Sequence, residues 1–313
     1  MADLSMEEVQ LLNQTICDGL DSRDPVRFKE AEDALEDFTR LKMREKGFAR
    51  NILPIQKVTN DQLDMQQHTS KPYKVFEMEI DSPAAVSVPL GTTPRQYWIK
   101  SRRYAVGFSR ILTPKFQVDV DELRTYRMDI RQVLSDNAIK DLLTEEDTKF
   151  LGQIDEMLIG AGMTQPFTGS VLYQQLSGGI TRDSLWDSLK VLPNTPLSLE
   201  VQTILLNHIT IKEYAKFPRD EMGGDLSADV MKNGVGVLED VTGRRWISTI
   251  KKGLVPTNHV YHFADPKFMG KFLALADTTM YMRREHFMLE FWGYVYNGMT
   301  IANIGSAAHI HFT

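Results

Sequence analysis

Cysteine is almost missing from this chain of 313 residues, since Cys17 is its only one. A disulfide within the chain and a metal site built on several cysteines are therefore both excluded. Long apolar runs are missing too, and none approaches the roughly 20 residues that a membrane-spanning helix needs. The first ten residues carry no basic cluster ahead of an apolar segment, so a secretory signal is not expected. We therefore expect a soluble protein made in a reducing cytoplasm, with no membrane partner.

A basic surplus is missing as well, because 36 Lys and Arg face 42 Asp and Glu and leave a net charge of −6. This balance disfavours a protein that reads nucleic-acid sequence through a basic surface. The hydrophobic share of 42% and the charged share of 25% are ordinary for a globular protein. The length allows two domains or one elaborated domain.

Motifs for catalysis and cofactor binding are also missing. No Gly-x-x-x-x-Gly-Lys-Ser/Thr loop occurs, and Gly234 and Gly236 form a glycine pair without the third glycine of a dinucleotide site. Neither a Gly-x-Ser-x-Gly elbow nor a His-Glu-x-x-His helix is present. The sequence therefore predicts no enzyme, no catalytic residue and no cofactor.

Two histidine pairs are the strongest candidates for metal ligands. His309 and His311 alternate on a predicted terminal strand, and His259 and His262 lie in another predicted strand. Neither pair has a third ligand nearby in sequence, which a zinc site would require. The acidic side chains of residues 119–122 are better explained as preceding a helix, where they meet its positive end. We expect no metal site.

Two helical patterns open the chain. Apolar residues recur at helical spacing from Met6 to Leu20, and Asp24-Pro25 can start a second helix that ends near Gly47. No apolar segment close by in sequence would cover the second helix. We interpret residues 1–55 as an arm, with two ordinary core helices as the alternative.

A two-stranded ribbon is predicted next. Residues alternate from Tyr73 to Ile80, Asp81–Arg95 is rich in turn residues, and Tyr97–Ile111 predicts the return strand. The outgoing strand is acidic and the return strand basic, so the ribbon suits a projecting hairpin better than a core. Its charges can pair within the hairpin or with another subunit. The residues that we predict at a contact between subunits are Glu77, Glu79, Arg102 and Arg103.

Helical spacing returns over 121–159, with a capping box at Thr144–Asp147 that would restart the helix, so one broken helix or two end to end are expected. The remainder is mixed. Helices are predicted over Ser184–Val191, from Thr210 to Phe217 with Thr210 and Glu213 at its cap, and over Ser227–Lys232; strands are predicted over Glu200–Leu206, Arg245–Ile250 and His259–Phe263. Asn297-Gly298 predicts a tight hairpin between Phe291–Tyr296 and Met299–Ile301.

The order of these parts resembles the major capsid protein family of tailed bacteriophages, which has the Hong Kong 97-type shell fold. Several stretches over residues 25–313 also resemble that family in their amino-acid sequence. They are Phe108–Leu112 with Phe116–Asp119, Thr144–Leu151, Gly243–Ile247, Leu254–Pro256, Val260–Phe263, Phe268–Gly270, Val295–Met299 and Ala302–Asn303. Such a resemblance is an analogy of fold.

The resemblance implies an α+β phage capsid shell fold. Its parts would be an N-terminal helical arm over 1–55, an extended β-hairpin loop over 56–118 and a spine helix of the peripheral domain over 119–165. A mixed α/β axial domain over 166–285 would follow, and residues 286–313 would supply the closing β-strands of the peripheral domain.

The implied function is self-assembly, as hexamers and pentamers, into an icosahedral shell around double-stranded DNA. Its partners would be other copies of the chain, a portal, possible scaffolding or decoration proteins, and packaged DNA touched without sequence preference. The protein would be made in a host bacterial cytoplasm and end in the virion. The alternatives are an encapsulin-like compartment shell and a soluble α/β enzyme with an unrecognised site.

Overall fold

The computed structural model describes residues 47–64, 71–79, 87–93, 101–119, 130–164, 172–195, 197–214, 243–251 and 253–313, together with Val26, Gln96 and Trp98. The two helices predicted for the arm therefore lie outside the described residues, apart from Val26 and Gly47. The helix predicted over Ser227–Lys232 and most of the turn over Asp81–Arg95 lie outside them as well.

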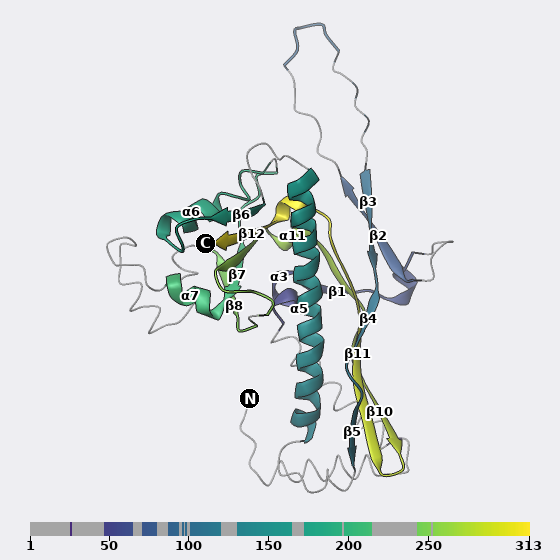
Figure 1. Cartoon of the computed structure of the whole chain (residues 1–313). Helices are drawn as coiled ribbons and strands as arrows, with labels where there is room; N and C mark the ends of the chain where they lie inside the picture. The colour runs from purple at the N-terminus through teal and green to yellow at the C-terminus, as the bar shows by residue number, and fades with distance from the viewer. Residues whose placement is uncertain are drawn as a thin grey trace.

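One long helix, α5 (Ile130–Thr164), runs through the middle of the molecule and separates two sheets (Figure 1). Its 35 residues make it far longer than the other described helices, which are α3 (Phe48–Ile52), α6 (Arg182–Leu189), α7 (His208–Tyr214) and α11 (Pro266–Met269). The sequence predicted a helical segment here, and α5 is continuous from its first to its last residue. The predicted restart at Thr144–Asp147 is wrong.

The reason for this error is visible in the side chains of α5. The hydroxyl groups of Thr144 and Thr148 donate to the carbonyl groups one turn earlier, of Lys140 and Thr144, at 2.7 and 2.6 Å. A threonine inside a helix can satisfy its hydroxyl in this way, so the residue type alone does not establish a cap. Glu146 and Asp147 are buried and bind groups outside the helix, so they do not cap it.

The first sheet has the order β1 (Ile55–Lys57), β10 (Gly270–Glu285), β11 (Met288–Ile301) and β4 (Ser109–Leu112), and β5 (Phe116–Asp119) also pairs with β11. Strands β10 and β11 form a long antiparallel ribbon, and β5 pairs with β11 near the far end of it (Figure 1). The sheet packs on α5 where Ile111 of β4 and Val295 of β11 meet Leu142 and Leu143 of the helix.

The hairpin predicted at Asn297-Gly298 is wrong, because both residues lie inside β11 and the turn of the ribbon falls at His286 and Phe287. His286 has φ 57°, which supplies the left-handed conformation of the turn. Asn297 donates to the Glu146 carboxylate of α5 at 2.8 Å. A Cβ on Gly298 would lie 2.5 Å from the Gly107 carbonyl oxygen. Asn297 is therefore used for a buried hydrogen bond, and Gly298 allows two backbone segments to approach closely.

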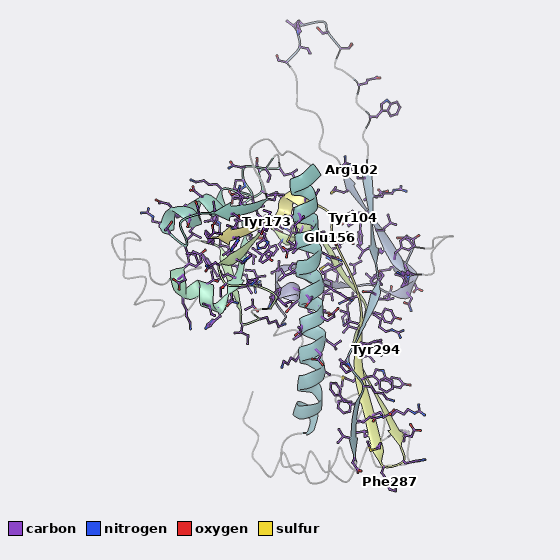
Figure 2. The ribbon with its side chains drawn as sticks, in the orientation of Figure 1. Arg102, Tyr104, Glu156, Tyr173, Phe287 and Tyr294 are labelled. Carbon is purple, nitrogen blue, oxygen red and sulfur yellow. The ribbon has the colours of Figure 1, made fainter. Side chains whose placement is uncertain are left out.

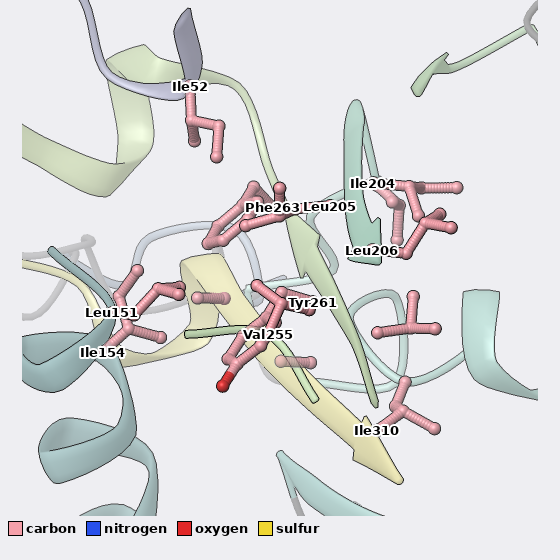
Figure 3. Packing of buried hydrophobic residues seen from close by; sticks show 14 of the residues in the cluster. Ile52, Leu151, Ile154, Ile204, Leu205, Leu206, Val255, Tyr261, Phe263 and Ile310 are labelled. Atoms are coloured by element: carbon pink, nitrogen blue, oxygen red, sulfur yellow. The ribbon is translucent and has the colours of Figure 1, made fainter. Parts of the chain in front are cut away.

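The second sheet has the order β6 (Tyr173–Leu176), β12 (Ala307–Phe312), β9 (His259–Phe263), β7 (Thr203–Asn207) and β8 (Arg245–Thr249). Strands are present where the sequence predicted them in β7, β8 and β9, although β7 begins three residues later than expected. The sheet packs on α5 around Phe150, Ile154, Tyr261 and Phe263, and Figure 3 shows part of this core.

Helix α7 begins at His208, so the predicted cap at Thr210 is wrong. The Ile209 amide donates to Asn207 Oδ1 at 2.9 Å, which places the polar cap at the end of β7. Thr210 is buried, and its hydroxyl oxygen accepts from the Asn258 amide at 3.0 Å. A tertiary partner therefore competes with the local capping pattern.

The third sheet is the hairpin of β2 (Tyr73–Glu79) and β3 (Ser101–Gly107). The predicted return strand is interrupted at Phe108, and its second part, β4, belongs to the first sheet. The described residues 87–93 lie far from the body, beyond the free end of this hairpin (Figure 1). None of the helices in the described part of the chain combines the length and apolarity needed to span a bilayer.

Candidate functional site

Three large apolar side chains are exposed on the parts that project from the body. Leu90 and Trp98, beyond the free end of the hairpin, are 106% and 89% exposed. Phe287, at the turn of the β10–β11 ribbon, is 72% exposed (Figure 2). Exposed apolar groups that gather on projecting segments are typical of surfaces that contact other proteins.

The hairpin brings two of the four predicted contact residues together. Glu77 and Arg103 are directly opposite in the β2–β3 register, and Arg103 Nη2 lies 2.8 Å from Glu77 Oε1. Both side chains are more than half exposed. Arg102 is exposed and its neighbour across the hairpin is Met78; Glu79 is paired in register with Ser101. Contact of these residues with another subunit remains a prediction.

The base of the hairpin is fixed to the body by apolar packing. Val106 and Phe108 are buried in a cluster with Val58 and Leu273, and Phe76 and Tyr104 stack above it with ring centroids 5.6 Å apart. Burial raises the pKa of Tyr104. The hairpin therefore has a rigid base and an exposed far end.

A buried polar network joins α3, at the end of the predicted arm, to α5 and the first sheet. The Arg50 guanidinium donates to both oxygens of Glu146 at 2.8 Å, and Asn297 donates to the same carboxylate. The side chains of Arg50 and Glu146 are 7% and 1% exposed. A buried ion pair is tolerated when the guanidinium binds both carboxylate oxygens and a further donor binds the same carboxylate.

Asp147 makes a second link at the next position. Its carboxylate accepts from the Ala49 amide at 3.0 Å and from Lys251 Nζ at 2.6 Å. Burial raises the pKa of Asp147, and the Lys251 ammonium opposes that shift. Sequence reasoning assigned Glu146 and Asp147 to a cap and missed both links. Adjacent acidic residues in an apolar helical stripe were the only available signal.

The face of β11 that points away from α5 is aromatic and cationic. Tyr294 and Tyr296 lie under the Arg110 guanidinium, with ring centroids 5.6 and 4.5 Å from its carbon, and Arg110 also donates to the Tyr296 hydroxyl. Further along, Lys115 lies 2.5 Å from Glu290, and its ammonium holds the pKa of that carboxyl below the usual value. Tyr, Trp and Arg are enriched at protein interfaces.

The structure brings members of the two predicted histidine pairs together. His309 and His311 share a face of β12, but the third imidazole on that face is His259, directly opposite His311 on β9. His259 Nδ1 and His309 Nε2 are 2.8 Å apart, and the rings of His259 and His311 stack with centroids 4.1 Å apart. His262 lies on the other face of β9, where burial lowers its pKa to about 3.

Asp155 of α5 completes this histidine cluster. One carboxylate oxygen lies 3.1 Å from His309 Nδ1, and the other accepts from the Tyr261 hydroxyl at 3.0 Å. Within the described residues, no group of three ligating side chains is positioned to hold a metal ion. The cluster therefore contains proton-binding groups in direct contact at the junction of α5 and the second sheet.

The fold, a central helix between two sheets with a projecting hairpin, is similar to that of three solved structures of virus-like particles or phage capsids. A virus-like particle from Pyrococcus furiosus matches with a TM-score of 0.55 and 16% identity, over 89% of this chain and 98% of that chain. The capsid of cyanophage P-SCSP1u matches with a TM-score of 0.55 and 12% identity, over 84% and 86%. The mature capsid of bacteriophage PhiM1 matches with a TM-score of 0.55 and 8% identity, over 86% and 87%.

At these identities the similarity is one of fold. No protein-family model matches the chain, and no curated protein matches it in sequence. The predicted resemblance to phage capsid proteins is thus confirmed in the three-dimensional structure, where sequence comparison finds nothing.

Proposed function

We propose that this chain is the major capsid protein of a tailed phage, which assembles as hexamers and pentamers into an icosahedral shell around double-stranded DNA. The capsid fold supports the class. The observation that carries the assembly step is the projecting hairpin, whose Trp98 and Leu90 are almost fully exposed. Apolar groups of this size gain about 1.5–3 kcal/mol each when a partner covers them.

Burial distinguishes the parts of the subunit that would contact its neighbours from the parts that form its core. Residues 101–107 of the hairpin, residues 87–93 beyond its end and the β10–β11 ribbon extend outward, whereas α5 and the second sheet enclose the main core. We propose that the first sheet with α5 forms the peripheral domain and that the second sheet, with α6 and α7, forms the axial domain. The hairpin would lie on a neighbouring subunit. A closed symmetric shell repeats this contact at every subunit, so a modest contact suffices.

Partners other than the chain itself follow from the same proposal. Scaffolding, portal or decoration proteins would act on the shell, and packaged DNA would be contained without being read. The net charge of −6 suits a wall that does not grip the polymer.

Electron microscopy of negatively stained, purified protein tests the proposal. Co-expression with the neighbouring phage genes supplies scaffolding, and large hollow particles of uniform size are expected. A stable monomer or dimer under all these conditions would contradict the proposal. Nucleic acid inside particles from infected cells supports the capsid, whereas a specific protein cargo supports the compartment-shell alternative.

A further inference from the structure

We propose that His259, His309, His311 and Asp155 form a proton-sensitive junction, which holds α5 against the C-terminal strand β12 near neutral pH and loosens when the histidines take up protons. The inference concerns the single subunit and does not depend on the proposed function.

The contacts of the junction define its neutral state. Asp155 Oδ1 lies 3.1 Å from His309 Nδ1, so the carboxylate favours a proton on that nitrogen. His309 Nε2 is then the acceptor of the neutral imidazole, and His259 Nδ1 donates to it across 2.8 Å. Tyr261 donates to the second oxygen of Asp155. Neither contact of His309 requires a charged histidine, and the one with Asp155 is electrostatic, since its two atoms are not in hydrogen-bond geometry.

One added proton can be accommodated. A proton on His309 Nε2 gives an imidazolium beside the carboxylate, and His259 Nδ1 then becomes the acceptor. A second proton cannot be placed in the same way, because His259 and His309 would present N–H groups to one another at hydrogen-bond distance. His311, stacked on His259 at 4.1 Å, adds a third basic ring to the same face. Three basic groups therefore share a single counter-charge.

The groups that face the junction come from four elements. Helix α5 contributes Asp155, β9 contributes His259 and Tyr261, β12 contributes His309 and His311, and β6 contributes Tyr173, whose ring meets His309 edge-on at 5.0 Å. Among these described groups, Asp155 supplies the one carboxylate. Protonation beyond the first proton therefore leaves the junction with excess positive charge.

The direction of the effect follows from proton linkage. Burial, then His309 and His311, lowers the pKa of His259 from its ordinary 6.5 to about 4, with Asp155 opposing. A folded-state pKa below the unfolded value means that the opened form binds more protons. The junction is therefore fully formed above pH 6.5 and is weakened as the pH falls toward about 4.

Hydrogen exchange measured by mass spectrometry on the full chain at pH 7.5, 6.5, 5.5 and 4.5, corrected for the intrinsic exchange rate, tests this inference. Protection in β9 and β12 is expected to fall by about tenfold or more between pH 6.5 and 4.5, since one pKa unit is a tenfold change in the equilibrium. Protection in the β10–β11 ribbon is expected to change much less. An equal change in both sheets, or none in β9 and β12, would overturn the proposal.

Variants separate the charge from the packing. His259→Gln keeps a neutral hydrogen-bonding side chain and is expected to flatten the pH dependence in β9 and β12. Asp155→Asn removes the counter-charge and is expected to move the loss of protection to higher pH. His208→Gln, at an exposed histidine of α7, is the matched control and should behave as the wild type.

If His259→Gln does not fold, His311→Gln gives the same test, because it removes the stacked ring. A pH dependence that is unchanged in the histidine variant used would show that the cluster is structural only. Protection lowered equally at every pH would lead to the same conclusion.

Discussion

Two tryptophans show how differently the hairpin and the second sheet use the same side chain. Trp246 on β8 is 5% exposed and meets the Tyr214 ring edge-on at 5.3 Å. Trp98, on the return segment of the hairpin, is 89% exposed. Burial of Trp246 stabilises the subunit itself. The exposed apolar surface of Trp98 adds little to the core, and under the proposed function it would stabilise a contact with another subunit. The hairpin and the core should therefore respond to mutation in different measurements.

Removing the far end of the hairpin should have the largest effect. Deletion of residues 81–95 is expected to abolish particle formation and to leave the subunit folded, because none of the described residues in this segment belongs to the core clusters. Electron microscopy measures the first effect and thermal melting the second. A Gly-Ser segment of equal length separates the role of reach from that of the side chains. Normal particles from the deletion variant would show that the hairpin is not required.

A cavity in the core should have the opposite signature. Phe150→Ala removes a fully buried ring that packs on Phe263 at 5.8 Å between centroids, so a loss of about 3–5 kcal/mol in the free energy of unfolding is expected. Leu90→Ala, at a fully exposed position, should change it by less than about 0.5 kcal/mol. Urea denaturation compares the two. Similar losses in both variants would remove the distinction between the two regions.

The buried ion pair behind the first sheet gives a third test. Glu146→Ala leaves the buried Arg50 guanidinium without its carboxylate. The free energy of unfolding is therefore expected to fall by up to about 3–5 kcal/mol. Glu145→Ala changes the exposed neighbour on the same turn of α5 and should cost less than about 0.5 kcal/mol. Urea denaturation of both proteins provides the comparison. A Glu146→Ala protein as stable as the control would mean that water replaces the lost carboxylate.

The surface charges of the hairpin should have the smallest effect on a single subunit. Reversing Arg102 and Arg103 to Glu breaks an exposed pair with Glu77, which contributes about 0–1 kcal/mol. The melting temperature should stay within a few degrees, while assembly slows and particle stability becomes more sensitive to salt, because salt screens such charges over about 8–10 Å. Light scattering at low and high salt measures this.

Additional reversal of Glu77 and Glu79 to Lys should restore part of the assembly rate. Since Glu77 pairs with Arg103 in the same hairpin, rescue alone does not distinguish that pair from a contact with another subunit. Mixing the Arg-reversed protein with a protein that carries only Glu77→Lys and Glu79→Lys does. Faster assembly of the mixture than of either variant alone indicates contact between subunits. Wild-type assembly by the Arg-reversed variant at low salt would show that these charges are only a solvated surface.

Local patterns in the sequence determined much of the backbone. Alternation over Tyr73–Glu79 indicated a strand with one exposed face, and helical spacing indicated a long helix that includes Ile130–Ile159. The strands at Arg245–Thr249 and His259–Phe263 were also predicted. These features depend on residues a few positions apart, which a single sequence displays directly. The order of such elements carried the resemblance to phage capsid proteins.

Partners distant in sequence were decided by the tertiary structure alone. Asn297 and Glu146 are 151 positions apart, and their hydrogen bond is the reason why Asn297-Gly298 lies in a strand and not in a turn. His259 and His309 are 50 positions apart, so two unremarkable pairs in the sequence became one cluster. A turn, cap or ligand motif in the sequence indicates only which kinds of bond a side chain is able to form. Which partner it bonds depends on how the sheets pack around α5, because a buried polar group takes whichever partner the packing brings within reach.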